Sequence, residues 1–303
     1  MTRDTLTPVP PIPPGPAARR PVGGDPGARP ARPARPALRV LGVALALALV
    51  GYGAIVVVSL LARVTSHSSA TYLGITTVEL DVGFEEVEIA GSATDGSVTL
   101  ERSSAWSLTQ PTVGQHRDGD RLVVTSRCPV SVGLACSGRI RLVVPPELAV
   151  LVTASKGSVQ VHDTTGPVTL DVDDAHVTLS RLAGAVAVRT SDGDVTVSDL
   201  TGRLTIRTSD GAVDGTGLRS RLVEVQSSDG AVRLGFASPP DLVTVRSRDG
   251  SVRVLVPDDR TSYQVAATTS DSDRTITVPT DAGSDHVLDL QTSDGSITVG
   301  TAE

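Results

Sequence analysis

The sequence predicts an all-β protein, a parallel β-solenoid of about 18–24 residues per rung behind one transmembrane helix and a disordered N-terminal tail. Three observations support this fold class. A turn motif recurs through the second half of the chain, apolar residues alternate at period two on both sides of it, and one long uncharged segment precedes the repeats. Aromatic residues make up only 2% of the chain, which is typical of many short strands and not of a large interlocked core.

Residues 1–37 are predicted to be a disordered cytoplasmic tail. Residues 1–39 hold seven arginines and two aspartates, and 11 of the 20 prolines fall within the first 36 residues. Such a composition buries too little apolar surface to fold alone. We expect a solvated basic tail near anionic lipid, and the alternative is a proline-rich ligand for a cytoplasmic partner.

Residues 38–63 are predicted to be a transmembrane helix. Val40–Ala62 is 23 residues without a charge, and a helix of that length spans about 35 Å. The arginines before it predict a cytoplasmic N-terminus and an extracytoplasmic C-terminal domain, with the cell membrane as the location. Residues 64–73 are then expected to be a juxtamembrane linker. A cleaved signal peptide ending near Ser68-Ser69-Ala70 is the alternative, although the apolar run is long for that class.

Residues 74–303 are predicted to form the solenoid domain, because a bend motif of the Ser-Asp-Gly type recurs eight times. The steps between copies are 18, 18, 18, 19, 20, 24 and 21 residues. Two residues after the third position of each copy stands a β-branched aliphatic residue: Val159, Val177, Val195, Val213, Val232, Val252, Ile276 and Ile297. Alternation on both sides of a tight bend indicates two strands per rung, each with one buried face. Consecutive repeats are expected to be neighbouring rungs, preceded over residues 73–150 by irregular rungs or a cap.

The bend motif predicts two rows of residues along the stack. Its glycines are expected to adopt positive φ as structural turns: Gly157, Gly193, Gly211, Gly230, Gly250 and Gly295. Its aspartates are expected to form a ladder of like charges: Asp174, Asp192, Asp210, Asp229, Asp249, Asp273 and Asp294. Turn chemistry explains the aspartates without a ligand. Weak binding of divalent cations is the sharper hypothesis, although the calcium nonapeptide is absent.

Cys128 and Cys136 are the only cysteines, and both follow the predicted membrane segment. In an oxidising compartment two cysteines this close are expected to form a structural disulfide. Without a histidine nearby they do not indicate a zinc site.

The repeats resemble a known family. The segments SKGSVQV, TSDGDVTVSDLTG, SSDGAVRLGF and SRDGSVRVLVPDD, preceded by CPVSVGLACSGRIRLVVP, look like those of the bacterial adhesin-like β-strand-repeat proteins. The resemblance covers roughly residues 75–301. It implies a β-strand-repeat domain, often behind one membrane helix, and it assigns no chemistry.

No catalytic motif is recognised, and no cofactor, metal or small-molecule substrate is predicted. The formal charge is −7 overall and −13 for residues 64–303, because residues 1–63 carry eight arginines and two aspartates; nucleic acid is therefore a poor partner. We expect a non-catalytic surface module for adhesion, envelope structure or interaction with a protein or cell-surface partner. An accessory or sensory membrane protein is the main alternative, and a polysaccharide-acting enzyme is a minor one.

Overall fold

The computed structural model describes residues 35–61, 64–107, 110–127 and 136–302. The chain divides into two compact units, residues 1–52 and 53–303, and each is described by itself. The apolar segment folds as helix α1 (Arg35–Leu61), which begins inside the predicted tail; residues 1–34 of that tail lie outside the described residues. Within the described residues there is no helix that combines the length and the apolarity needed to cross a membrane.

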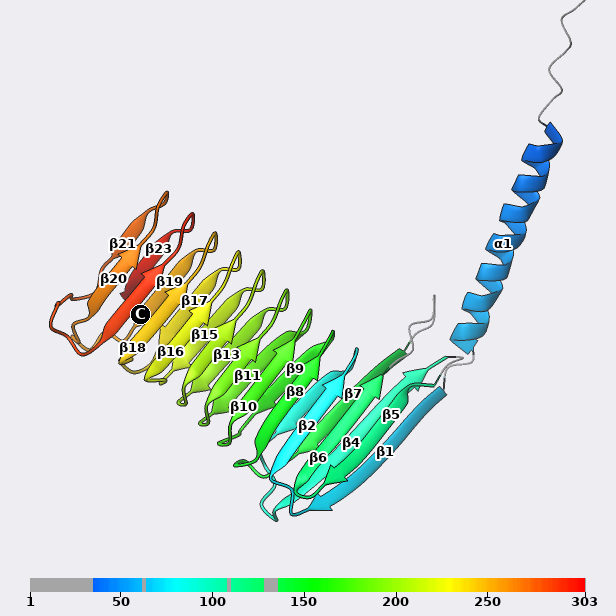
Figure 1. Cartoon of the computed structure of the whole chain (residues 1–303), viewed down its shortest axis with the longest axis horizontal. Coiled ribbons are helices and arrows are strands. Elements are labelled where there is room, and N and C mark those ends of the chain that lie inside the picture. The colour runs from blue at the N-terminus through cyan, green and yellow to red at the C-terminus, as the bar shows by residue number, and fades with distance from the viewer. Residues whose placement is uncertain (1–34, 62–63, 108–109, 128–135, 303) are drawn as a thin grey trace, which may run out of the picture. The chain divides into compact units, whose positions relative to one another are not determined.

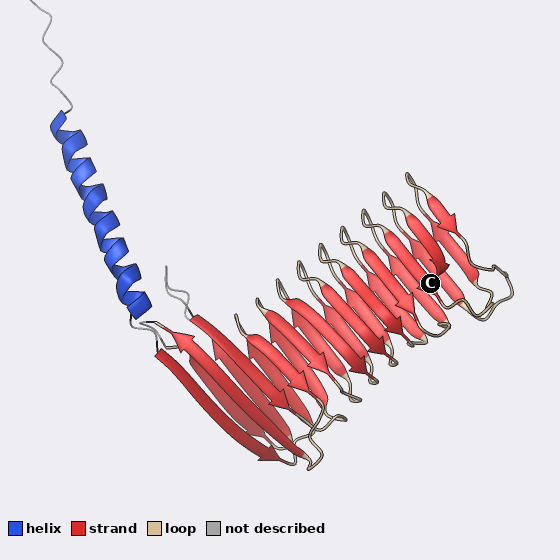
Figure 2. Cartoon of the chain, turned by 180° about the vertical axis from the view of Figure 1, so that it is seen from behind, coloured by secondary structure: helices blue, strands red, loops and turns tan. Residues whose placement is uncertain are grey.

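The rest of the described chain is all-β, which confirms the all-β part of the predicted fold class. It contains 23 strands in two sheets, most of them parallel (Figures 1 and 2). Sheet A runs in the order β1 (Val64–Leu73), β4 (Ser97–Trp106), β7 (Cys136–Val143), β3 (Glu86–Ala90), β9 (Ser158–His162), β11 (His176–Leu182), β13 (Val195–Leu200), β15 (Val213–Leu218), β17 (Val232–Phe236), β19 (Val252–Val256), β23 (Ile297–Thr301) and β21 (Arg274–Ile276). Sheet B runs in the order β20 (Gln264–Thr268), β22 (Val287–Gln291), β18 (Leu242–Arg246), β16 (Leu222–Gln226), β14 (Leu204–Arg207), β12 (Val186–Arg189), β10 (Val168–Val172), β8 (Ala149–Ala154), β2 (Thr77–Val82), β6 (Arg121–Arg127) and β5 (Thr112–Asp118).

From β8 to β19 the chain alternates between the two sheets, so that each rung has one strand in each. A sheet-B strand passes through the bend motif into a sheet-A strand, and a second corner returns the chain to sheet B one rung further on. Equivalent residues of successive repeats pair in register, as Val177 with Val195 and Val195 with Val213. The 18-residue spacing in the sequence is therefore the length of one rung.

The core lies between the two sheets and is filled by the alternating aliphatic residues. Val195 and Val213 on sheet A are 1% and 0% exposed, and Leu204 and Ile206 on sheet B are 0% exposed. Burying one such side chain stabilises the fold by roughly 1.5–3 kcal/mol. Stacking is what allows each thin rung to keep this stabilisation, because its neighbours cover it on both sides.

The order of rungs departs from the order of the chain at both ends, so the prediction that consecutive repeats are neighbours is wrong there. The β22–β23 rung lies between β18–β19 and β20–β21, and β2–β3 lies between β8–β9 and β6–β7. Packing explains the exchange at the C-terminal end. Leu288 and Leu290 of β22 are 0% exposed in an interior rung, whereas β20 offers Ala267, which is 7% exposed, and the half-buried Val265. The rung with the smaller apolar side chains takes the end position, where only one side is covered.

The N-terminal end is finished by antiparallel strands, and the prediction of a linker at residues 64–73 is wrong. These residues form β1, which pairs with β4 in an unbroken register from Val64–Trp106 to Leu73–Ser97. The segment contains Val64, Thr65, Thr71 and Tyr72, which are residue types that favour strands. β5 closes sheet B against β6 in the same antiparallel manner.

Candidate binding surface

Six of the seven ladder aspartates lie at the same bend of adjacent rungs, in the order Asp174, Asp192, Asp210, Asp229, Asp249 and Asp294. The seventh was assigned wrongly. The carbonyl of Asp273 accepts a hydrogen bond from the amide of Ile297, two positions beyond the bend. Asp271 takes its place, because its amide donates to Ser293 as the amide of Asp294 donates to Arg248. Residues 270–273 are Ser-Asp-Ser-Asp. Only when the bend motif is aligned on the first Ser-Asp pair do Val265 and Ala267 face the core.

Neighbouring carboxylates oppose one another along this row. The pKa of Asp210 and the pKa of Asp249 are raised above the ordinary value, in both cases mainly by Asp229; the aspartate on the other side adds to the shift in both, after desolvation in the case of Asp249. At the N-terminal end of the row the opposite holds. The ammonium of Lys156 lies 3.1 Å from Asp174 and lowers the pKa of that carboxyl.

The ladder does not make a convergent metal site. In the described ranges no three or more carboxylate, imidazole or thiolate groups come together as ligands for an ion. The carboxylates follow a line from rung to rung, whereas calcium takes six to eight oxygens around one point. Cation binding by the row stays a prediction.

The bend glycines are required for a reason other than the one predicted. Of the six, only Gly157 has a positive φ, at 103°. At Gly193 an added Cβ would lie 2.0 Å from the carbonyl oxygen of Ala175 in the rung below, and at Gly211 it would lie 2.1 Å from that of Gly193. Close stacking of backbones, and not left-handed geometry, therefore excludes side chains at these positions. The predicted disulfide is outside the described residues, since Cys128 is not among them and the side chain of Cys136 is not described.

A polar hollow of about 500 Å³ lies on the outer face of sheet A near its N-terminal end. Four neighbouring strands line it: β1 contributes His67, β4 contributes Glu101 and Arg102, β7 contributes Arg139 and Arg141, and β3 contributes Glu88. Serine hydroxyls from β1 and β4 complete the wall. We call this site the sheet-A hollow.

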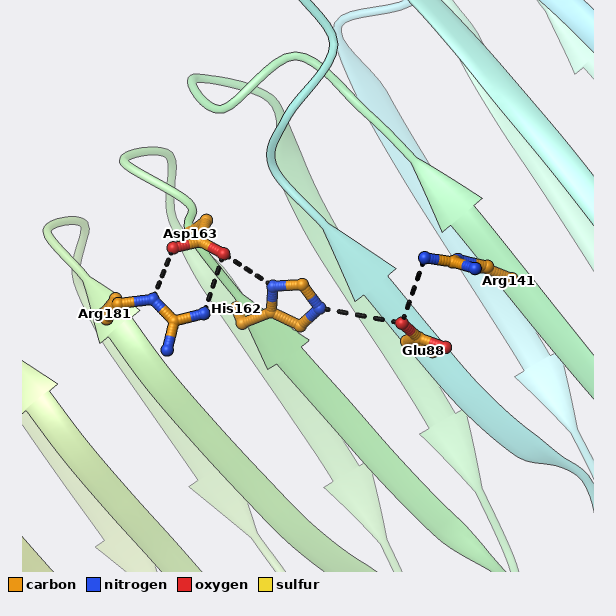
Figure 3. Close-up of polar contacts among 5 residues, drawn as sticks. All are labelled: Glu88, Arg141, His162, Asp163 and Arg181. Atoms are coloured by element: carbon orange, nitrogen blue, oxygen red, sulfur yellow. Dashed lines mark hydrogen bonds and ion pairs between the residues drawn. The ribbon is translucent and has the colours of Figure 1, made fainter.

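A chain of charged side chains continues from the hollow along the same face (Figure 3). Glu88 lies 3.6 Å from Arg141 and 3.8 Å from the imidazole of His162. His162 contacts Asp163 at 2.7 Å, and Arg181 donates two hydrogen bonds to the same carboxylate at 2.6 and 2.8 Å. These bonds hold the pKa of Asp163 well below its usual range, with Arg181 as the largest cause.

The backbone at Asp163 helps to place this chain. Its φ is 61°, and the equivalent residues of the next two rungs, Arg181 and Asp199, have φ of 53° and 52°. In the following rung Gly217 occupies the position with φ of 63°. Non-glycine residues seldom adopt these values, so this corner stores a small strain of the kind found where side chains are held in a fixed direction.

Arg102 borders the hollow, but it pairs in register with Ile140, which is 0% exposed, so its side chain is directed to the inner face of sheet A. Its Nη1 is buried and has no hydrogen-bond partner in the part of the chain that the structure describes. A buried guanidinium nitrogen without an acceptor costs free energy, but a ligand in the hollow would not reach it, because the two lie on opposite faces of the sheet. Arg139, whose side chain is on the outer face, is paired with Glu86 at 2.7 Å.

A second hollow, of about 470 Å³, lies on the outer face of sheet B. It is lined by Arg207, Arg246 and Arg248 together with serine and threonine hydroxyls. Arg246 is already paired with Asp289 at 2.5 Å, and Arg207 lies 3.4 Å from Glu224. Its lining holds neither an acidic side chain nor a histidine, unlike that of the sheet-A hollow, and we take it as the second candidate.

Sequence reasoning did not find the sheet-A hollow. Its residues come from positions 67 to 141, a region without the repeat, and they meet only because β3 and β7 are neighbours while β1 and β4 fold back antiparallel. One signal was available: Glu86 and Glu88 stand two apart, as do Arg139 and Arg141, which is the pattern of facing charged pairs on adjacent strands.

A two-sheeted stack of parallel rungs with polar outer faces is a β-strand-repeat architecture. Residues 135–300 match the family model described as Toastrack DUF4097, and the chain belongs to this family. The resemblance to adhesin-like β-strand-repeat proteins is thereby confirmed. Among curated proteins, none matches this chain.

Solved structures of low similarity include three bacterial proteins. One is described as a putative adhesin from Bacteroides fragilis (13% identity, 78% of this chain and 97% of that chain covered, TM-score 0.40). Another is a putative cell adhesion protein from Clostridium sporogenes (9%, 79% and 100%, TM-score 0.30). The third is a putative lipid binding protein from Parabacteroides distasonis (13%, 78% and 96%, TM-score 0.32). We draw no functional conclusion from these likenesses.

Proposed function

We propose that this protein is a non-catalytic surface protein of the cell membrane that presents a β-solenoid to an extracytoplasmic partner. One observation carries the proposal: the sheet-A hollow, of about 500 Å³, brings Arg139, Arg141 and His67 together with serine side chains on the outer face of the sheet. A partner bearing carboxylate and hydroxyl groups, as on an envelope glycan or an acidic protein surface, would accept hydrogen bonds from these guanidinium and hydroxyl groups.

The location is part of the proposal and rests on the sequence. The uncharged segment Val40–Ala62 follows seven arginines, the pattern of a single-pass anchor with a cytoplasmic N-terminus. A role in adhesion or envelope attachment requires the solenoid to lie on the outer side of the membrane. Trypsin applied to intact cells should degrade residues 64–303 and spare a cytoplasmic marker protein; full protection of the domain would contradict this location.

Binding can be tested with cell-wall sacculi from the source organism and the full-length protein in detergent. The wild type should co-sediment with the sacculi, and Arg141→Met should weaken binding about tenfold or more, because a charge-assisted hydrogen bond is lost. The melting temperature of this variant should change little, since the contact of Arg141 with Glu88 is a solvent-exposed ion pair.

Arg189→Met is the matched control. Arg189 lies on β12 of sheet B, outside the sheet-A hollow. It should bind sacculi as the wild type does. Equal loss in both variants, or no co-sedimentation of the wild type, would contradict a binding role for the sheet-A hollow.

A further inference from the structure

The two sheets end in four edge strands, and one of them differs from the others. The edges are β1 and β5 at the N-terminal end and β20 and β21 at the C-terminal end. Edge strands expose backbone groups that can pair with another chain, and stable proteins usually obstruct them. The devices that obstruct an edge can be looked for strand by strand.

Three of the edges carry such devices. β21 is three residues long and begins with Arg274, whose guanidinium donates to the carbonyl of Ala267 at 2.9 Å. At the start of β20, residues 279–281 bond to both backbone groups of Tyr263. β5 ends in the exposed charged pair Arg117 and Asp118.

β1 carries none of these devices. It is ten residues long, its register with β4 contains no bulge, and its sequence VTSHSSATYL has no proline, glycine, lysine, arginine, aspartate or glutamate. Only Ala70 and Tyr72 are half-buried, and the other eight residues are exposed. No described strand pairs with its second side, so alternate N–H and C=O groups along the strand face outward from the sheet.

We propose that β1 pairs antiparallel with β1 of a second copy of this chain, which joins two A sheets edge to edge. The strand suits its own copy, because a strand without formal charge meets no like-charge repulsion and its serine and threonine side chains leave the backbones room to approach. Antiparallel pairing of identical strands creates a two-fold axis perpendicular to the sheet. The dimer is thus closed, and it does not continue into a fibre.

The pairing has a consequence for the sheet-A hollow. A two-fold axis perpendicular to the sheet keeps the outer faces of both A sheets on the same side. His67 and the β1 serines line the hollow beside the axis, so the two hollows adjoin and form one symmetric surface. This inference goes beyond the proposed function and does not depend on the identity of the partner that binds there.

The test uses the full-length chain in detergent micelles, with the protein mass measured by light scattering after subtraction of detergent. The wild type should have twice the mass of one 31.1 kDa chain. The double variant Thr65→Lys with Thr71→Lys should weaken the dimer about 100-fold or more, because four ammonium groups would crowd one face of the joined strands. Both threonines are exposed in the single chain, so folding and melting temperature should be unchanged.

The matched control is Thr178→Lys with Thr196→Lys. It adds the same charge at exposed positions on β11 and β13 of the same sheet, far from the edge, and should stay dimeric. A cross-link supplies the second measurement. Ser68→Cys or Ser69→Cys, at the centre of β1, should form an intermolecular disulfide on mild oxidation that neither the wild type nor Thr178→Cys forms.

Three results would overturn the proposal. The first is a monomeric wild type. The second is a single chain whose β1 pairs with a strand of a different protein. The third is a dimer that survives the β1 lysines and shows no cross-link at Ser68 or Ser69, which would place the interface elsewhere, for example in α1.

Discussion

The centre and the two ends of the stack are built by different rules. From β8 to β19 the rungs follow the order of the chain, pair in parallel and repeat every 18–20 residues. At both ends a rung is exchanged, and at the N-terminal end β1, β4 and β5 run antiparallel. The centre repeats because every interior rung has the same surroundings, whereas an end must also cover or present a free edge.

Among the variants that test this comparison, the largest loss of stability is expected for a substitution in the core of the central rungs. Val195→Asp places a carboxylate where the side chain is 1% exposed, with β11 and β15 on either side. Burying an unpaired charge should cost about 4 kcal/mol or more. Thr196→Asp is the control, since this neighbour is exposed on the outer face. Thermal melting should show the first variant largely unfolded and the second close to wild type, and similar melting of both would refute the register.

The next largest loss of structure is expected when the exchanged C-terminal rung is removed. A chain ending at Asp285 loses β22 and β23, which lie inside the stack although they come last in the sequence. β20 and β21 would then lose the only described strands that pair with them. Amide hydrogen exchange should show residues 257–285 unprotected while β8 to β17 stay protected. Removal of residues 302–303 alone is the control and should change little.

Continued protection of β20 in the shortened chain would mean that it pairs with β18, as the order of the chain would suggest. Such an outcome would remove the exchange from the description of this end. Loss of protection limited to the last two rungs would show that the contribution of a rung to stability depends on its interior position in the stack and not on its position in the sequence.

The sequence was sufficient for the centre and insufficient for the ends, for a physical reason. Each central rung carries a local pattern, such as Val195 and Val197 facing inward beside the bend at Gly193, and local patterns can be read from one sequence. Whether β20 or β22 takes the interior position depends on which of the two rungs buries more apolar side chain there. No local sequence pattern contains that comparison. Residues 64–73 looked like a linker because nothing within them shows that β4 will pair with them.

A third prediction separates two reasons for glycine, one in the centre and one near the N-terminal end. Gly193→Ala places a Cβ 2.0 Å from the Ala175 oxygen, and this overlap should cost about 3 kcal/mol. Gly96→Ala is strained only through its φ of 70°, with no atom within 4 Å of the added Cβ, and should cost about 1 kcal/mol. Chemical denaturation measures both values. Equal costs would favour left-handed geometry at the central bends over close stacking.

The candidate site was beyond sequence reasoning for a related reason. The Asp row could be predicted because its members repeat, and the single misplaced member, Asp273, arose where two Ser-Asp pairs follow one another. The sheet-A hollow combines residues from four strands that do not repeat.

The smallest effect is expected within the Asp row, where its middle and its N-terminal end should respond with opposite sign. The pKa of Asp210 is raised, so the folded state binds its proton more readily than the unfolded state does; its charge destabilises the fold at neutral pH, and stability is regained as the pH falls through the folded pKa. Asp210→Asn should therefore raise the melting temperature at pH 7, by on the order of 1 °C for so exposed a group. The gain should fade toward acid pH, where the carboxyl is already protonated.

Asp174 should behave in the opposite way. Its pKa is lowered by Lys156, so its stabilising contribution is present above the unfolded pKa of about 3.9 and is lost as the pH falls through the folded pKa. Asp174→Asn should lower the melting temperature slightly at pH 7, and high salt should shrink both differences. Calorimetric scans of both variants at pH 7 and pH 3, with and without 1 M salt, measure the four differences. If both variants change in the same direction at pH 7, the row is not a ladder of interacting charges.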